Sequence, residues 1–167
     1  MPLILMGYIN PVLQFGMEKF CQKCQEIGID GIILPDMPMQ VYLDEYKTHF
    51  EKHGLINIFL ITPQSSDERI RWIDQNSQGF IYMVSSYSTT GGATGFGFNQ
   101  LSYFERIQSL ELKNPTVIGF GISSKQDFQA ACEHANGAII GSAFVKMLGN
   151  SKQLDTDIKQ FVKEIKG

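Results

Sequence analysis

Six short, nearly continuous apolar segments alternate along the chain with segments of helical periodicity, and this alternation constrains the fold most strongly. The apolar segments span residues 3–9, 31–36, 56–61, 80–85, 116–121 and 138–143. They do not alternate between polar and apolar residues, which is typical of strands that are buried on both faces of a parallel sheet. The pattern therefore predicts six consecutive βα units in a parallel α/β fold.

The segments between the apolar runs carry helix signals. The first has apolar residues spaced by three or four, namely Leu13, Met17, Phe20, Cys24 and Ile27. This spacing predicts one helical face that ends at Gly28. Farther along, Ser65 with Glu68 has the spacing of a capping box, and Ser124 with Asp127 has the residues of a helix start.

Two architectures are compatible with this order. One is an open, doubly wound sheet, and the other is a (β/α)8 TIM barrel, which needs eight units and roughly 250 residues. No linker rich in proline or serine divides the sequence, so residues 1–167 are expected to form a single domain. With 43% hydrophobic and 19% charged residues, the composition is that of a globular protein.

Composition also excludes several classes of partner. The chain has 14 basic and 17 acidic residues, a net charge of −3 and no basic run, which argues against nucleic acid. No apolar run reaches the ~18 residues of a membrane span. An odd number of cysteines, three, indicates a reducing compartment and hence a cytoplasmic protein. Cys21 and Cys24 lie inside a helical stripe, and no spacing typical of metal ligands occurs, so no metal site is expected.

The glycines after the last two apolar runs predict a phosphate site. The fifth run ends in GFGIS (119–123) and the sixth in GSA (141–143), each followed by a helical pattern. Glycine allows the backbone to approach an anion, and a helix N-terminus offers free N–H groups. Because barrels often bind phosphate after strands seven and eight, the six runs are interpreted as strands three to eight of a barrel.

Two further segments stand at predicted strand ends. Residues 85–97, which read SSYSTTGGATGFG, predict a lid over a phosphorylated substrate, with Thr90 and Gly91 near its second hinge. Asp36 follows the second run and has three interpretations from the sequence: a structural residue, a residue that positions an interface loop, or a catalytic base.

The ordered set of these motifs resembles the tryptophan synthase alpha chain family. The opening segment LMGYINP (5–11) is similar to the third strand of that family and its Tyr-x-Asn-Pro continuation. The segments GIDG (28–31) and LPDMP (34–38) are similar to its fourth strand and loop, and Pro63 to its fifth-strand exit. Thr90-Gly91 matches the lid, and 119–123 with 141–143 match the phosphate cradle.

This resemblance implies a specific chemistry and site. The family cleaves indole-3-glycerol phosphate by a retro-aldol reaction into indole and glyceraldehyde 3-phosphate, without a cofactor. Indole passes to a beta chain that holds pyridoxal phosphate, in an α2β2 assembly. The implied phosphate ligands are Gly91, Gly121, Gly141 and Ser142. The implied substrate pocket has Tyr8, Leu60 and Tyr82, with Thr90 in the lid and Asp36 facing the beta chain.

The sequence departs from the family in two respects. The two acid/base carboxylates of the family lie on the second strand and the following loop, and neither unit is found in residues 1–167. No catalytic residue is therefore assigned, and the chain is expected to be a C-terminal portion that is inactive and poorly stable or self-associating alone. The lid also carries Ser88-Thr89 where Gly-Val is commoner in the family.

Two alternative functions remain open from the sequence. One is another phosphate-binding barrel enzyme, such as an indole-glycerol-phosphate synthase or a sugar-phosphate isomerase. A lysine at a strand end would favour the synthase, and the sequence places none there. The other is a non-catalytic remnant that binds only a phosphate or the beta chain.

Overall fold

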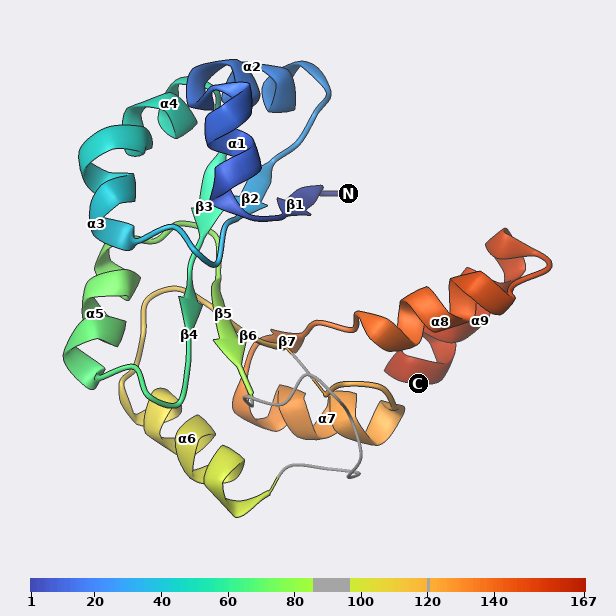
Figure 1. Cartoon of the computed structure of the whole chain (residues 1–167). Helices are drawn as coiled ribbons and strands as arrows, with labels where there is room; N and C mark the ends of the chain where they lie inside the picture. The colour runs from blue at the N-terminus through green and yellow to red at the C-terminus, as the bar shows by residue number, and fades with distance from the viewer. Residues whose placement is uncertain (86–96, 120) are drawn as a thin grey trace.

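The alternation of strands and helices predicted from the sequence is present in the structure. A computed structural model describes residues 1–85, 97–119 and 121–167 (Figure 1). The strands are β1 (Ile4–Met6), β2 (Gly31–Ile33), β3 (Ile56–Ile58), β4 (Leu60–Ile61), β5 (Ile81–Val84), β6 (Thr116–Gly119) and β7 (Gly137–Ala138). The helices are α1 (Ile9–Phe15), α2 (Met17–Glu26), α3 (Met39–Val41), α4 (Lys47–Lys52), α5 (Asp67–Asn76), α6 (Phe98–Ser109), α7 (Lys125–His134), α8 (Ser142–Asn150) and α9 (Leu154–Lys166), and a π-helical turn (Tyr42–Tyr46) joins α3 to α4.

The strand order distinguishes between the two architectures. All pairings in the described residues are parallel, in the orders β1-β2-β3 and β4-β5-β6-β7. Only Phe59 separates β3 from β4, and its carbonyl accepts a hydrogen bond from the Tyr82 N–H at 2.9 Å. Each unit therefore lies beside the next without the reversal of a doubly wound sheet, which is the order of a barrel.

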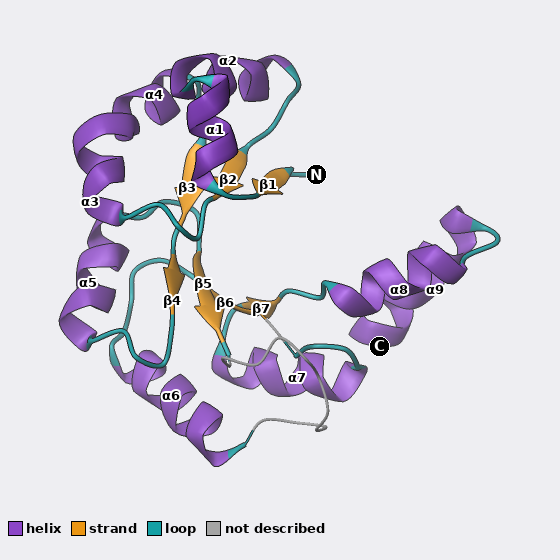
Figure 2. Ribbon diagram, in the orientation of Figure 1, coloured by secondary structure: helices purple, strands orange, loops and turns teal. Residues whose placement is uncertain are grey.

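The barrel is open. Figure 1 shows the strands on the inner side of an arc, with helices α3 to α6 on its outer side. Strand β1 lies at one end of the arc, and the α8–α9 pair lies at the other, as Figure 2 also shows. Among the described residues, β1 pairs only with β2 and β7 only with β6, so both edges of the sheet are unpaired.

The apolar runs are continuous because both faces of the strands are buried. Ile33, Ile58 and Tyr82 form a small cluster on one face, joined by Leu60 and by other partly buried residues. Neighbouring strand residues such as Ile32 belong to a larger cluster, which includes helical residues such as Phe104. The first cluster faces the barrel axis and the second lies between strands and helices, as expected for this fold.

One helix prediction was wrong. The stripe from Leu13 to Ile27 predicted a single helix, but the structure has two, α1 and α2, that meet at Gly16. Gly16 adopts φ +93°, which is favourable only for glycine. Its N–H donates to the carbonyls of Val12 and Leu13 and so ends α1. Leu13 and Ile27 are exposed as a result, whereas Met17 and Cys24 are buried.

Two helix starts also differ from the prediction. The hydroxyl of Ser66, not Ser65, accepts the Arg69 N–H at 3.2 Å and caps α5, while the Ser65 hydroxyl accepts the Thr62 N–H. The last apolar run, expected as a strand over 138–143, forms a strand only at Gly137–Ala138. Its end belongs to α8, which begins at Ser142. The helix start predicted at Ser124, with Asp127 in the first turn, is confirmed, and the two residues form a capping box.

The cysteines provide a prediction about reactivity. Cys21 and Cys24 are buried, whereas Cys132 is exposed. Burial raises the pKa of Cys21 to about 11 and also raises the pKa of Cys24. Because the thiolate is the reactive form, we expect iodoacetamide at pH 8 to alkylate Cys132 alone, and all three cysteines in denaturant. Mass spectrometry checks this result, and rapid alkylation of Cys21 in the folded chain would contradict it.

Candidate functional site

The start of α7, which the sequence suggested as one wall of a phosphate site, is already occupied by a carboxylate of the chain. Asp127 Oδ2 accepts hydrogen bonds from the N–H and the hydroxyl of Ser123, both at 3.1 Å, and from the Ser124 N–H at 3.0 Å. The Ser124 hydroxyl in turn accepts the Asp127 N–H. The backbone N–H groups of Ser123 and Ser124 are therefore not available to a ligand.

The neighbouring glycines and the start of α8 are open. Gly121 has φ +80°, and no atom of the described residues lies within 4 Å of the position that a Cβ would take at Gly121 or Gly141. Gly141 precedes α8 and provides no side-chain cap. Within residues 1–85, 97–119 and 121–167, the N–H groups of Gly121, Gly141 and Ser142 donate no hydrogen bond. These three donors and the positive end of the α8 dipole are available to an anion.

A pocket joins the two strand exits. It has a volume of about 550 Å³, and it is lined by Ser123, Ser142, Ala143, Lys146, Met147 and Asn150. Ser123 follows β6 and Ser142 follows β7, so the structure brings together the two glycine-containing motifs that the sequence singled out. A pocket at the carboxyl ends of adjacent parallel strands is the usual ligand position in a barrel.

Lys146 is a site residue that the sequence analysis missed. Its side chain lines the pocket, and it forms no salt bridge among the described residues. A signal was present in the sequence, because Lys146 follows Ser142 by four positions and so lies on the same face of α8. An ammonium group at this place adds a full positive charge to the backbone donors.

Leu60 and Tyr82 lie side by side, as the resemblance implies for the substrate pocket. They are directly paired between β4 and β5 and belong to the inner apolar cluster. Tyr82 is buried, and burial raises the pKa of its phenol, so the side chain is uncharged at neutral pH. Its ring packs against Gly119, where an added Cβ would overlap the ring.

The other residues of the implied site are not gathered here. Tyr8 is 69% exposed and is not part of the cluster around Tyr82. Both carboxylate oxygens of Asp36 accept the Ile9 N–H, at 3.0 and 3.2 Å, so this side chain holds the start of α1. Thr90 and Gly91 lie outside the described residues.

The described residues contain neither a metal-binding cluster nor a membrane-spanning helix. No three His, Cys, Asp or Glu side chains lie close enough together there to bind a metal ion. In the same part of the chain, no helix has the length and hydrophobicity that crossing a membrane requires.

Comparison with known proteins decides the family. The model of the family described as "Tryptophan synthase alpha chain" matches residues 1–166. The chain belongs to this family. The tryptophan synthase alpha chain of Flavobacterium johnsoniae is 63% identical over 165 residues, which cover 99% of this chain and 64% of that relative. The chain thus spans about two thirds of the length of this alpha chain.

Solved alpha chains have the same fold. A mutant tryptophan synthase alpha-subunit from Pyrococcus furiosus aligns with a TM-score of 0.82 and 31% identity, covering 98% of this chain and 66% of its own. A chain of the tryptophan synthase complex from the same organism aligns with a TM-score of 0.81 and 28% identity, covering 98% and 65%. The comparisons confirm the prediction of an incomplete (β/α)8 barrel of the alpha chain type.

Proposed function

We propose that this chain provides the phosphate and indole sites of an alpha chain that cleaves indole-3-glycerol phosphate into indole and glyceraldehyde 3-phosphate. The observation that carries the proposal is the pocket at the ends of β6 and β7. Ser142 and Lys146 line this pocket, and Lys146 forms no salt bridge with any described residue. The N–H groups of Gly121, Gly141 and Ser142 at the same strand exits donate no hydrogen bond within the described residues. Backbone donors together with one cation are suited to a phosphate dianion.

In this proposal, Gly91 completes the phosphate site and the indole ring lies near Leu60 and Tyr82, with Tyr8 close by. The paired position of Leu60 and Tyr82 on the inner face of the barrel supports this assignment. An apolar ring surface and an uncharged phenol are suitable neighbours for an indole. Thr90 would then fasten the lid over the bound substrate.

The cleavage itself needs groups from outside residues 1–167. A base removes the proton from the glycerol hydroxyl next to the bond that breaks, the C–C bond electrons move to the indole, and an acid protonates the indole ring carbon. Both proton transfers require positioned side chains. The carboxylates nearest the described strand ends, Asp36 and Asp127, already accept backbone N–H groups. We therefore assign both transfers to the two βα units that would precede β1.

We further propose that the chain needs no cofactor and works with a beta chain that holds pyridoxal phosphate, in an α2β2 assembly in the cytoplasm. A structure of a tryptophan synthase complex among its structural neighbours supports the partnership. The loop with Asp36 is the proposed contact with the beta chain. The Asp36 carboxylate accepts the Ile9 N–H and so holds this loop against the start of α1. Two buried cysteines without a disulfide agree with a reducing compartment.

Binding of glycerol 3-phosphate tests the phosphate site. We expect Lys146→Met to weaken binding about fivefold, the effect of one partly exposed ion pair. Ser142→Pro removes an N–H at the first helical position, where proline is well tolerated, and should weaken binding about tenfold or more. Ser142→Ala keeps that N–H and should have a smaller effect. Isothermal titration calorimetry measures the affinities.

Two controls make the result interpretable. Lys152→Met removes a positive charge just beyond α8, outside the pocket, and should leave the affinity unchanged. Fluorescence of Trp72, the single tryptophan, checks that each variant is folded. Equal affinities of the wild-type chain, Lys146→Met and Ser142→Pro would refute the phosphate site.

A further inference from the structure

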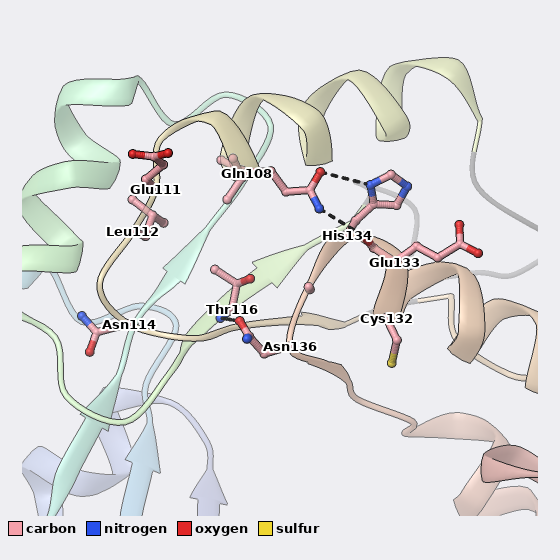
Figure 3. Close-up of a pocket in the computed structure, with 11 residues that line it drawn as sticks. Gln108, Glu111, Leu112, Asn114, Thr116, Cys132, Glu133, His134 and Asn136 are labelled. Atoms are coloured by element: carbon pink, nitrogen blue, oxygen red, sulfur yellow. Dashed lines mark hydrogen bonds between the residues drawn. The ribbon is translucent and has the colours of Figure 1, made fainter.

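A second pocket lies at the opposite end of the barrel wall from the proposed phosphate site. It has a volume of about 380 Å³ and is formed by the end of α6, the loop over 111–114, the first residue of β6 and the end of α7 (Figure 3). Thr116, at the start of β6, lies on its floor, whereas Gly121 of the phosphate site follows the other end of that strand. The pocket is small but within the range of small-molecule sites.

Hydrogen bonds hold the walls of this pocket together. Gln108 on α6 donates its Nε2 to the Glu133 carbonyl of α7 at 3.1 Å, and its Oε1 lies 3.5 Å from His134 Nδ1. At the base, the Thr116 N–H donates to Asn136 Oδ1 at 2.9 Å. The dashed lines in Figure 3 mark these contacts between α6 and α7. The pocket is therefore a feature of the packed structure and not of a single loop.

The electrostatics of the pocket favour a cation. Helices α6 and α7 both end at it, so the negative ends of two helix dipoles point toward it. Glu111 and Glu133 lie on opposite sides of the pocket, and Figure 3 shows their carboxylates pointing outward from its rim. No lysine or arginine is among the lining residues, and the Lys113 ammonium nearby donates to the Gln75 carbonyl at 2.9 Å.

Thr116 provides the point at which a ligand would be held. The residue is only 8% exposed, and its hydroxyl makes no hydrogen bond with any described residue. In Figure 3 its side chain extends into the space between Gln108 and Asn136. The hydroxyl oxygen is accessible from the pocket, and it can accept hydrogen bonds from a ligand that carries N–H groups.

We propose that this pocket binds a small organic cation with a primary ammonium group on a short alkyl chain. The ammonium donates to Thr116 Oγ1, and the negative ends of the α6 and α7 dipoles attract its charge, with a weaker, longer-range attraction from Glu111 and Glu133 at the rim. The alkyl part packs on Ile107 and Leu112, which line the same pocket. A metal ion is a poorer occupant, because the described residues hold no group of three ligating side chains. This site is separate from the proposed phosphate site and does not depend on it.

Cys132 offers a direct probe, because it lines the pocket and is the exposed one of the three cysteines. The experiment measures the rate at which iodoacetamide alkylates Cys132 in the 167-residue chain at increasing n-butylammonium chloride. We expect saturable slowing of alkylation. Tetramethylammonium chloride at equal ionic strength has no N–H group and should protect much less, and neutral n-butanol should not protect.

Variants identify the residues responsible. Thr116→Val keeps the shape and removes the hydroxyl, so the half-protecting concentration should rise about tenfold, whereas Thr116→Ser should retain protection. Glu133→Gln should raise this concentration about twofold, because its carboxylate acts from the rim of the pocket. Glu105→Gln removes a charge from α6 outside the pocket and serves as the matched control. The proposal is overturned if tetramethylammonium protects as well as butylammonium, or if Thr116→Val or Glu133→Gln behaves like the wild-type chain.

Discussion

Gly119→Ala is expected to lower the free energy of unfolding by about 1–3 kcal/mol, the usual range for overpacking a core. A Cβ at this position would overlap Cε2, Cζ and Oη of Tyr82. The ring has no free space to move into, because Tyr82 is 4% exposed and packs in the inner cluster with Ile33 and Ile58. The substitution should therefore displace Tyr82 and distort the proposed indole site as well.

A double-mutant cycle isolates this contact. Urea unfolding followed by Trp72 fluorescence gives the stability of Gly119→Ala, Tyr82→Ala and the pair. In the Tyr82→Ala background, the cost of Gly119→Ala should fall below about 0.5 kcal/mol, because the clash is gone. Gly137→Ala lies on the neighbouring strand, and no atom of the described part of the chain is within 4 Å of its Cβ position, so it should change stability little. If the losses of unfolding free energy of Gly119→Ala and Tyr82→Ala simply add in the double variant, the contact between these residues is not the cause of the destabilisation.

The chain alone is expected to self-associate as its concentration rises. The residues of β1 are exposed apolar side chains, with Leu5 41% and Met6 55% exposed. The backbone on the outer side of β1 has no strand partner among the described residues, and β7 lacks one on the opposite edge. An exposed apolar edge strand is a template for pairing with another chain.

A charge on this edge should oppose that association. We expect Leu5→Lys to shift the chain toward the monomer in sedimentation velocity, because a lysine on an edge strand blocks pairing. Val145→Lys, at a helical position that is 67% exposed, introduces the same charge away from β1 and should have no such effect. A wild-type chain that stays monomeric and melts in one sharp transition would contradict the expectation.

The sequence predicted the units of the fold because burial of a strand on both faces leaves a direct mark in the residue pattern. The apolar runs at 56–61 and 80–85 became β3 to β5 for this reason. The pattern could not choose between an open sheet and a barrel, since that choice depends on pairing between strands distant in the chain. The structure decides in favour of the barrel, because neighbouring strands follow one another in sequence order.

The errors at the helix ends have local physical causes. Helical spacing continues through Gly16, but its positive φ breaks the helix, and apolar spacing carries no information about φ. Ser65 and Ser66 are both capping residues, and the path of the preceding turn determines which one caps α5. Such choices depend on a few backbone angles that neighbouring segments impose.

The candidate site was predicted only in part. Gly121, Gly141 and Ser142 lie where the motifs suggested, with open space at both glycines. Asp127 was predicted as a residue of the first helical turn, but its side chain also accepts hydrogen bonds from the N–H and the hydroxyl of Ser123. This depends on the three-dimensional turn after β6. Lys146 was missed because a single lysine on an amphipathic helix is most often a solvent-exposed residue.

Indole formation from indole-3-glycerol phosphate tests the central claim most directly. The 167-residue chain is compared with the same chain preceded, in one polypeptide, by the two N-terminal βα units of the Flavobacterium johnsoniae alpha chain. We expect no detectable indole from the 167-residue chain and steady indole formation from the longer one, because only the latter combines the acid/base groups with the phosphate site. Indole formation by the 167-residue chain, or a folded but inactive longer chain, would contradict this account.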